Sequence, residues 1–176
     1  MKSTGVVRRV DDLGRIVIPK EIRRTLRIRD GESLEIFVDR EMITLKKFSK
    51  MNNLEEVSKH LVDIINSVVN KDVLIADRDR FLAVAGNSKK KYLDKNISKS
   101  LEKIMGDRKY VMEKSRHEIE LLDKEKELLS YIISPIIMNG DVIGLAMIIS
   151  DKEDIGQLEE KMVNVMAQFL GKYVED

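Results

Sequence analysis

Short runs rich in β-branched and other apolar residues lie in the first fifty positions, and such runs are typical of strands. In Ser33 to Val38 the residues Leu34, Ile36 and Val38 also alternate with their neighbours, the period-two pattern of a half-buried strand. Stretches that contain Asp and Gly separate the runs and are typical of turns. Proline fits the first position of a helix, so Pro19 predicts a short helix with Ile22 and Leu26 on its buried side. The strands are expected at 6–10, 15–18, 33–38 and 42–48.

This first domain, residues 1–50, is too small to bury much surface by itself. Four short strands and one helical turn also leave open strand edges, which interleaving with a second copy would remove. A two-fold dimer would present the same surface twice and would suit a roughly symmetric partner. We therefore expect the domain to be at least dimeric.

A polar stretch at 49–53 predicts a domain boundary, followed by a linker helix within 51–70. Apolar residues recur there at heptad-like spacing from Leu54 to Val68. The helix either packs on its own domain or pairs with a partner chain, and the spacing leaves both interpretations open.

The remaining residues, 71–176, predict a sheet flanked by helices. An Asn139-Gly140 pair between the two strongest apolar runs predicts a tight hairpin. Asp154 is expected to cap a last helix whose wide apolar stripe has one side for the sheet and another for a neighbouring helix. Strands are expected at 73–76, 81–85, 118–122, 128–138 and 142–149, a charged loop at 123–127, and helices from about Ser98 to Met105 and over 155–173.

Charge is distributed unevenly along the chain. Residues 1–29 hold nine Lys or Arg and three acids, a net of +6, although the whole chain is only +1. Such a basic head is an expected footprint of binding to a polyanion, and the planar guanidinium of arginine suits phosphates and guanine edges. The alternative is a solvated face in which the arginines pair with Asp11, Asp12 and Glu21.

The run GVVRRVDDLGRIVIPKEIRRTLRI and the following DGESLEIFVDREMITLKKFS strongly resemble the AbrB-type DNA-binding domain of bacterial transition-state regulators. The resemblance covers residues 1–50 and implies an interleaved dimer of swapped hairpins, a β-barrel that binds double-stranded DNA through a basic face. The implied DNA contacts are Arg8, Arg15, Arg23 and Arg24, with Arg9 and Lys2 as secondary candidates.

In its length and in the residues that follow the first domain, the chain resembles a regulator of late spore-formation genes. The implied function is a DNA-binding transcription regulator, an activator or a repressor, of sporulation genes. Related swapped-hairpin domains serve as antitoxins, so a protein-partner module is the alternative.

The second domain resembles a GAF domain, because SPIIMNGDVIGLAMIIS is similar to the closing hairpin of that family. This resemblance implies an α+β protein whose second domain senses an unknown small molecule or oligomerises. Two self-association surfaces, the first domain and the helices at 54–70 and 155–174, predict a homotetramer.

Enzymatic chemistry has little support in the sequence. No Ser-His-Asp set, Walker loop or dinucleotide glycine motif appears, and His60 and His117 are far apart. Cysteine is absent, which excludes disulfides, thiol chemistry and cysteine-ligated zinc. Asp77 and Asp79 alternate with arginines, so a salt-bridged turn is favoured over a cation site. We expect no catalytic residue, metal or cofactor.

Two further expectations follow from composition. The lysine run at 89–91 is interpreted as solvated surface, with a ligand or DNA contact as the less favoured alternative. No apolar run reaches the length of a membrane span, and the first ten residues lack the apolar core of a leader peptide. We expect a cytoplasmic protein with no membrane partner.

Overall fold

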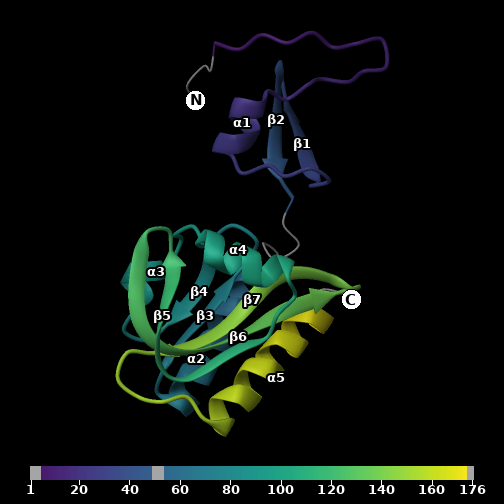
Figure 1. Ribbon diagram of the computed structural model, residues 1–176. Coiled ribbons are helices and arrows are strands. Elements are labelled where there is room, and N and C mark those ends of the chain that lie inside the picture. Colours follow the sequence, from purple (N-terminus) through teal and green to yellow (C-terminus); the bar gives the residue numbers. More distant parts are fainter. Residues whose placement is uncertain (1–4, 49–53, 174–176) are drawn as a thin grey trace. The chain divides into compact units, whose positions relative to one another are not determined.

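The computed structural model describes residues 5–48 and 54–173. The chain divides after Phe48 into two compact units, and each is described here by itself (Figure 1). The first unit contains α1 (Lys20–Thr25), β1 (Leu34–Asp39) and β2 (Met42–Lys47). The second contains α2 (Glu55–Val69), β3 (Asp72–Ala76), β4 (Phe81–Ala85), α3 (Lys89–Tyr92), α4 (Lys99–Gly106), β5 (Val111–Leu122), β6 (Glu125–Met138), β7 (Asp141–Ser150) and α5 (Gln157–Tyr173).

The first unit is built on one antiparallel hairpin. Leu34 lies opposite Lys47 and Asp39 opposite Met42, which leaves two residues for the turn. Arg40 adopts a left-handed φ of 50° in that turn, a conformation that tight hairpin turns require. The predicted strands over 33–38 and 42–48 are thereby confirmed within one residue at each end.

The predicted strands at 6–10 and 15–18 are wrong for the single chain, because these residues form no strand in the structure. They run as a long open arm around a turn at 11–14 (Figure 1). A strand exists only where a neighbouring backbone supplies hydrogen bonds, and within residues 5–48 the strand β1 pairs with β2. Within residues 5–48, no strand pairs with these two segments, although they are rich in β-branched residues.

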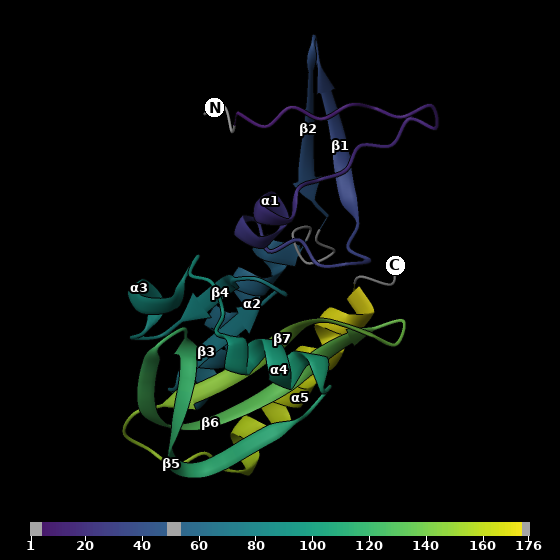
Figure 2. The same cartoon turned by 45° about the horizontal axis from the view of Figure 1, so that its top comes forward.

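The second unit is an antiparallel five-stranded sheet with the order β4-β3-β7-β6-β5. Helices cover both faces, and Figure 2 shows α4 on one side of the sheet and α5 on the other. Side chains from α2 and α5 form one apolar core with the sheet, and side chains from α3 and α4 form a second core on the opposite face. The result is the expected sheet flanked by helices.

One side of helix α2 packs on its own domain, as the first of the two alternatives predicted. Its side chains Val62, Ile65 and Val69 are buried in the core on the α5 side of the sheet. The helix therefore packs on its own domain and belongs to the second unit. Asn53, in the predicted boundary, lies outside the described residues.

Several local predictions are confirmed. Met138 pairs with Asp141, so Asn139 and Gly140 form the tight turn, both with positive φ. The Ser98 side chain accepts a hydrogen bond from the Leu101 N–H at 3.1 Å and caps α4.

Other boundaries differ from the prediction. Strand β5 contains the whole predicted 118–122 strand, and β6 takes in residues 125–127 of the predicted loop, so the turn contains only two residues. Long-range pairing extends both strands, although the intervening sequence is highly charged. Helix α5 begins at Gln157, and its first turn is capped by Glu159, whose carboxylate accepts the Gly156 N–H at 2.8 Å; Asp154 is not the cap.

The turn after β3 is held by backbone hydrogen bonds to Asp77, and the ion pairs of Arg80 are with acids outside the turn. Asp77 Oδ1 accepts the backbone N–H groups of Asp79 and Arg80, each at 2.7 Å. The Arg80 guanidinium in turn pairs with Glu55 at 3.1 Å and with Asp94. Among the described residues, no group of three or more His, Asp or Glu is arranged to hold a metal ion.

Candidate nucleic-acid interface

The turn of the basic arm is organised by Asp11. Its Oδ1 accepts the backbone N–H of Leu13 at 3.1 Å and of Arg15 at 2.7 Å, and its Oδ2 accepts Arg15 Nε at 2.7 Å. The Arg15 backbone bond, followed by the Arg15 side chain, lowers the pKa of the Asp11 carboxyl. Gly14 closes the turn at a φ of 75°, which favours glycine.

Arg15 is therefore paired with an acid but still accessible. Its side chain is 70% exposed beside Asp11. Only Nε is used in that contact, so the terminal guanidinium nitrogens of Arg15 are directed to solvent or to a ligand. The alternative that predicted acidic partners for the arginines is confirmed for this one pair.

The two arginines of α1 have different environments. Arg23 is half-buried, and its Nη1 donates to Asp30 Oδ1 at 2.9 Å. The side chain of Arg24 is exposed and has no hydrogen-bond or ionic partner among residues 5–48 and 54–173. Arg24 is therefore available to a ligand, whereas Arg23 also holds α1 to the following turn.

The arm carries the other candidates. Arg8 and Arg9 are exposed. Arg8 Nη1 donates to the adjacent Val7 carbonyl at 3.2 Å, and neither arginine is paired with an acid in the part of the chain that the structure describes. Lys2 lies outside the described residues.

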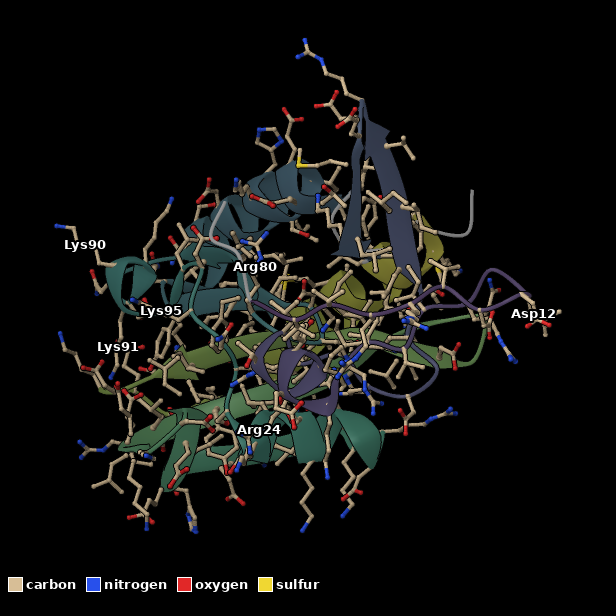
Figure 3. The ribbon with its side chains drawn as sticks, turned by 90° about the horizontal axis from the view of Figure 1, so that it is seen from above. Asp12, Arg24, Arg80, Lys90, Lys91 and Lys95 are labelled. Carbon is tan, nitrogen blue, oxygen red and sulfur yellow. The ribbon has the colours of Figure 1, made fainter. Side chains whose placement is uncertain are left out.

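The single chain does not gather these cations into one compact site. Figure 3 shows Asp12, at the turn of the arm, well separated from Arg24 on α1. The candidate interface is therefore an extended surface made of the arm and one helix. An extended row of cations suits a long polyanion better than a small anionic ligand.

Sequence reasoning assigned no role to two further exposed cations, Lys20 and Arg40. Lys20 opens α1, and Arg40 lies at the tip of the β1–β2 hairpin. The sequence pattern predicted the helix start that contains Lys20 and the turn that contains Arg40. It gave no sign of a role for either, because a single exposed cation belongs to no specific motif. Both belong to the same basic unit as the predicted contacts.

Glu32 pairs with Arg29 and Lys47, so these two cations are not candidates for contact with a ligand. Arg29 Nη1 lies 3.2 Å from its carboxylate and Lys47 Nζ lies 3.4 Å from it. Burial by itself raises the pKa of Glu32, but the Arg29 N–H and the Lys47 charge outweigh burial and hold it below its usual value. This cluster joins the turn before β1 to the end of β2 and is structural.

The first unit also exposes many large apolar side chains. None of residues 5–48 is buried. The large side chains that are exposed include both faces of the β1–β2 hairpin. They are Val6, Val7, Val10, Leu13, Ile16, Val17, Leu26, Ile36, Phe37, Val38, Met42, Ile43, Leu45 and Phe48.

The whole chain is 47% identical over 177 residues to stage V sporulation protein T of Bacillus subtilis (strain 168), with 99% of each chain covered. The chain belongs to the stage V sporulation protein T family. Residues 53–175 also match the family described as "Stage V sporulation protein T C-terminal, transcription factor". Members of this family are transcription factors, and the chain is one of them.

The two units have separate likenesses. A stretch of 48 residues, 27% of this chain, is 65% identical to half of the transition state regulatory protein AbrB of Bacillus subtilis. Residues 7–55 match the family described as "Antidote-toxin recognition MazE, bacterial antitoxin". The GAF domain of an Acinetobacter phosphoenolpyruvate-protein phosphotransferase matches 74% of this chain and 84% of its own at 14% identity and a TM-score of 0.58, which shows a GAF-like fold.

These findings confirm the predicted α+β class and the family. The sporulation regulator family and the AbrB-like first unit also agree with the function that the resemblance implied. Within the described residues, no helix combines the length and the apolar character needed to cross a membrane.

Proposed function

We propose that this chain is a DNA-binding transcription regulator of sporulation genes whose first unit contacts double-stranded DNA. The observation that carries the proposal is the set of exposed arginines on the arm and α1, in a unit whose sequence is closely similar to AbrB. Arginine offers paired, parallel N–H donors to phosphates and to guanine edges. Arg8, Arg9, Arg15 and Arg24 are the proposed contacts, and Arg23 both contacts DNA and holds α1 through Asp30.

We further propose that the first unit is an interleaved dimer. A unit without a buried residue has no apolar core to offset the loss of chain entropy on folding. A second copy would cover the exposed side chains of the hairpin, and its strands would pair with residues 6–10 and 15–18. The two-fold axis would then place two arms and two copies of α1 on one DNA face.

The second unit is proposed to join such dimers into a tetramer. On α5, exposed apolar residues Leu158, Val165 and Phe169 recur at helical spacing, and Ile64 and Val68 do the same on α2. Both helices lie on the same face of the sheet. A second copy of this face is the proposed partner.

A small molecule in this unit is less well supported than self-association. The face of the sheet under α3 and α4 is filled by buried side chains, among them Phe81, Tyr92 and Leu101. The rings of Phe81 and Tyr92 lie with centroids 5.4 Å apart. A ligand there would have to displace closely packed side chains, which costs free energy.

The match of residues 7–55 to an antitoxin family favours a second candidate function, a protein-partner module built on the same first unit. The match to the sporulation regulator covers the whole chain and includes the folded second unit. DNA binding is therefore the preferred proposal. A bacterial regulator of this kind would act in the cytoplasm and would need no catalytic residue.

Arg24→Gln tests the proposal, because the exposed side chain of Arg24 has no hydrogen-bond or ionic partner among residues 5–48 and 54–173, so its loss should leave the fold intact. We expect weaker binding to a mixed-sequence duplex. The dependence of log affinity on log salt should be less steep by about one unit for each phosphate that is no longer neutralised. Lys161→Gln on α5 is the control.

Unchanged affinity and salt dependence in Arg24→Gln would remove Arg24 from the interface. Failure of the unmodified full chain to bind duplex DNA would overturn the proposed function and favour the protein-partner candidate.

A further inference from the structure

A lysine-rich surface lies on a unit that is otherwise acidic. Residues 86–106 hold six lysines and two acids, a net of +4. The rest of residues 49–176 holds 14 basic and 21 acidic residues, a net of −7. The lysines of 86–106 are all exposed, so the positive charge of this unit is concentrated in one segment of its surface.

One of these lysines is neutralised within the unit. Lys91 Nζ lies 2.5 Å from a carboxylate oxygen of Glu127, and the other oxygen of Glu127 accepts the Tyr92 hydroxyl at 2.8 Å. The carboxylate of Asp72 is also engaged, because it accepts the backbone N–H groups of residues 87 and 88 at 2.7 and 3.0 Å. These acids are therefore not available to the neighbouring lysines.

The other nearby acids are held by Arg80. Its guanidinium pairs with Asp94 and with Glu55, and Glu55 also binds Lys59 at 2.8 Å. Five of the six lysines in 86–106, all except Lys91, have no ionic partner among residues 5–48 and 54–173. Three of these five lie on α3 or directly after it and form the α3 lysine cluster, Lys89, Lys90 and Lys95.

The cluster stands on a fixed backbone. Phe81, at the start of β4, donates its N–H to the Lys95 carbonyl at 3.0 Å, and its own carbonyl accepts the Asp94 N–H at 3.1 Å. The Lys91 N–H bonds the Ser88 carbonyl at 2.9 Å in the turn of α3. Figure 3 shows Lys90, Lys91 and Lys95 gathered around α3, at one side of the unit.

We propose that the α3 lysine cluster binds backbone phosphates of the duplex DNA held by residues 5–48. The inference rests on the proposed function and adds a second contact site, on the GAF-like unit. Lysine acts as a compact point charge, which suits phosphate but carries little base preference. The cluster therefore contributes affinity and salt dependence rather than sequence choice.

Duplex DNA is favoured over other polyanions because the same chain holds it. Once the first unit is bound, a tethered second unit meets DNA at a high effective concentration, so a few weak contacts suffice. The described ion pairs of the fold make no use of these three charges. A polyanion outside the chain is therefore the partner that would neutralise them.

Charge removal is the first test, done on the full chain with a fluorescent mixed-sequence duplex. Lys89→Gln, Lys90→Gln and Lys95→Gln are combined, since Gln removes the charge and keeps a polar, flexible side chain. The salt dependence should become less steep by about one unit for each lysine that binds a phosphate. Lys152→Gln, Lys161→Gln and Lys172→Gln combined are the matched control, because these three lysines are exposed and lie outside 86–106. An Arg triple variant should restore the slope.

Site-specific crosslinking is the second test, and the cysteine-free chain makes it direct. Lys90→Cys and, as control, Lys161→Cys are each labelled with a photoreactive aryl azide and irradiated with the duplex. Crosslinks from position 90 well above those from position 161 support the proposal.

The outcomes separate the two proposals. If the unmodified chain binds DNA while the Gln triple variant keeps the same slope and position 90 gives no excess of crosslinks, the cluster does not contact DNA and the proposed function stands. If the unmodified chain binds no duplex, both proposals fail. Preferential crosslinking of position 90 to single-stranded RNA in competition also overturns the assignment to duplex DNA.

Discussion

Glu159 shows how one side chain can join the ends of two elements. It is 6% exposed, its Oε1 lies 3.0 Å from Lys71 Nζ, and its Oε2 accepts the Gly156 N–H. Burial by itself raises the pKa of Glu159, but the N–H bonds and the Lys71 charge outweigh burial and keep it below its usual value. The charged form is therefore the one that the fold stabilises.

Glu159→Gln is expected to lower the free energy of unfolding of the second unit by about 1–3 kcal/mol near neutral pH, since it removes a charge-assisted hydrogen bond. A lowered pKa makes the contribution complete above the unfolded value of about 4.5 and removes it as pH falls through the folded value. Urea unfolding of both proteins at neutral and acid pH should show the difference shrinking in acid. Glu56→Gln, at an exposed carboxylate on α2, is the control.

Gly171 is required by a close approach between α5 and β6. A Cβ at this position would lie 2.3 Å from the Ile137 carbonyl oxygen, which is backbone and cannot rotate away. Gly171→Ala should therefore shift the helix and cost about 1–3 kcal/mol of stability. Gly106→Ala in α4 is the matched control, because its Cβ would meet no heavy atom within 4 Å and alanine favours a helix. Equal unfolding midpoints for the two variants would contradict this interpretation.

At the scale of elements, the sequence predicted best where one short-range pattern decided the structure. Strands β6 and β7 are continuous buried apolar runs joined by Asn139-Gly140, and both were expected nearly in full. Strand β5 begins seven residues before its predicted start, because residues 114–118 are exposed and polar on both faces. Pairing with β6, interrupted by irregularities near Glu113 and Glu120, makes this segment a strand.

The sequence likewise predicted some parts of the candidate interface and not others. The arm and α1 were found from charge and motif, and the Arg15 pairing with Asp11 was readable because the two are four residues apart. The Arg23 pairing with Asp30 depends on the chain returning after α1, and local pattern does not encode that return. Residues 6–10 and 15–18 form no strand in the single chain, although their β-branched composition predicts two. Such composition indicates a preference for strand structure but does not show which strand will pair with it.

Exposed apolar stripes on α2 and α5 lead to a prediction at this scale. Val165→Glu places a charge in the stripe, so it should shift the proposed tetramer of the full chain to a dimer while the second unit keeps its fold. Gln168→Glu adds the same charge at another exposed position of α5 and should leave assembly unchanged. Sedimentation velocity measures the mass and circular dichroism the fold. If both variants have the mass of the same tetramer, the contact between dimers does not involve this stripe.

Across the whole molecule, charge and apolar burial follow the division into units. Residues 1–48 hold 12 basic and 8 acidic residues, so the first unit is basic, while the second is acidic outside its lysine-rich segment. The second unit has two apolar cores, whereas residues 5–48 have no buried residue. The basic unit thus carries the proposed recognition surface, and in the proposed dimer it depends on a second copy for its stability.

That dependence has a direct thermodynamic consequence. If a second copy supplies the missing core, the isolated fragment 1–52 unfolds with dissociation, and mass action raises its melting temperature as protein concentration increases. Fragment 53–176 contains both cores of the second unit, and its main transition should depend far less on concentration. Circular dichroism melts of each fragment over a hundredfold range of concentration make the comparison. A cooperative melt of 1–52 with a fixed midpoint would show that one copy folds alone, and the interleaved dimer would then lose its physical basis.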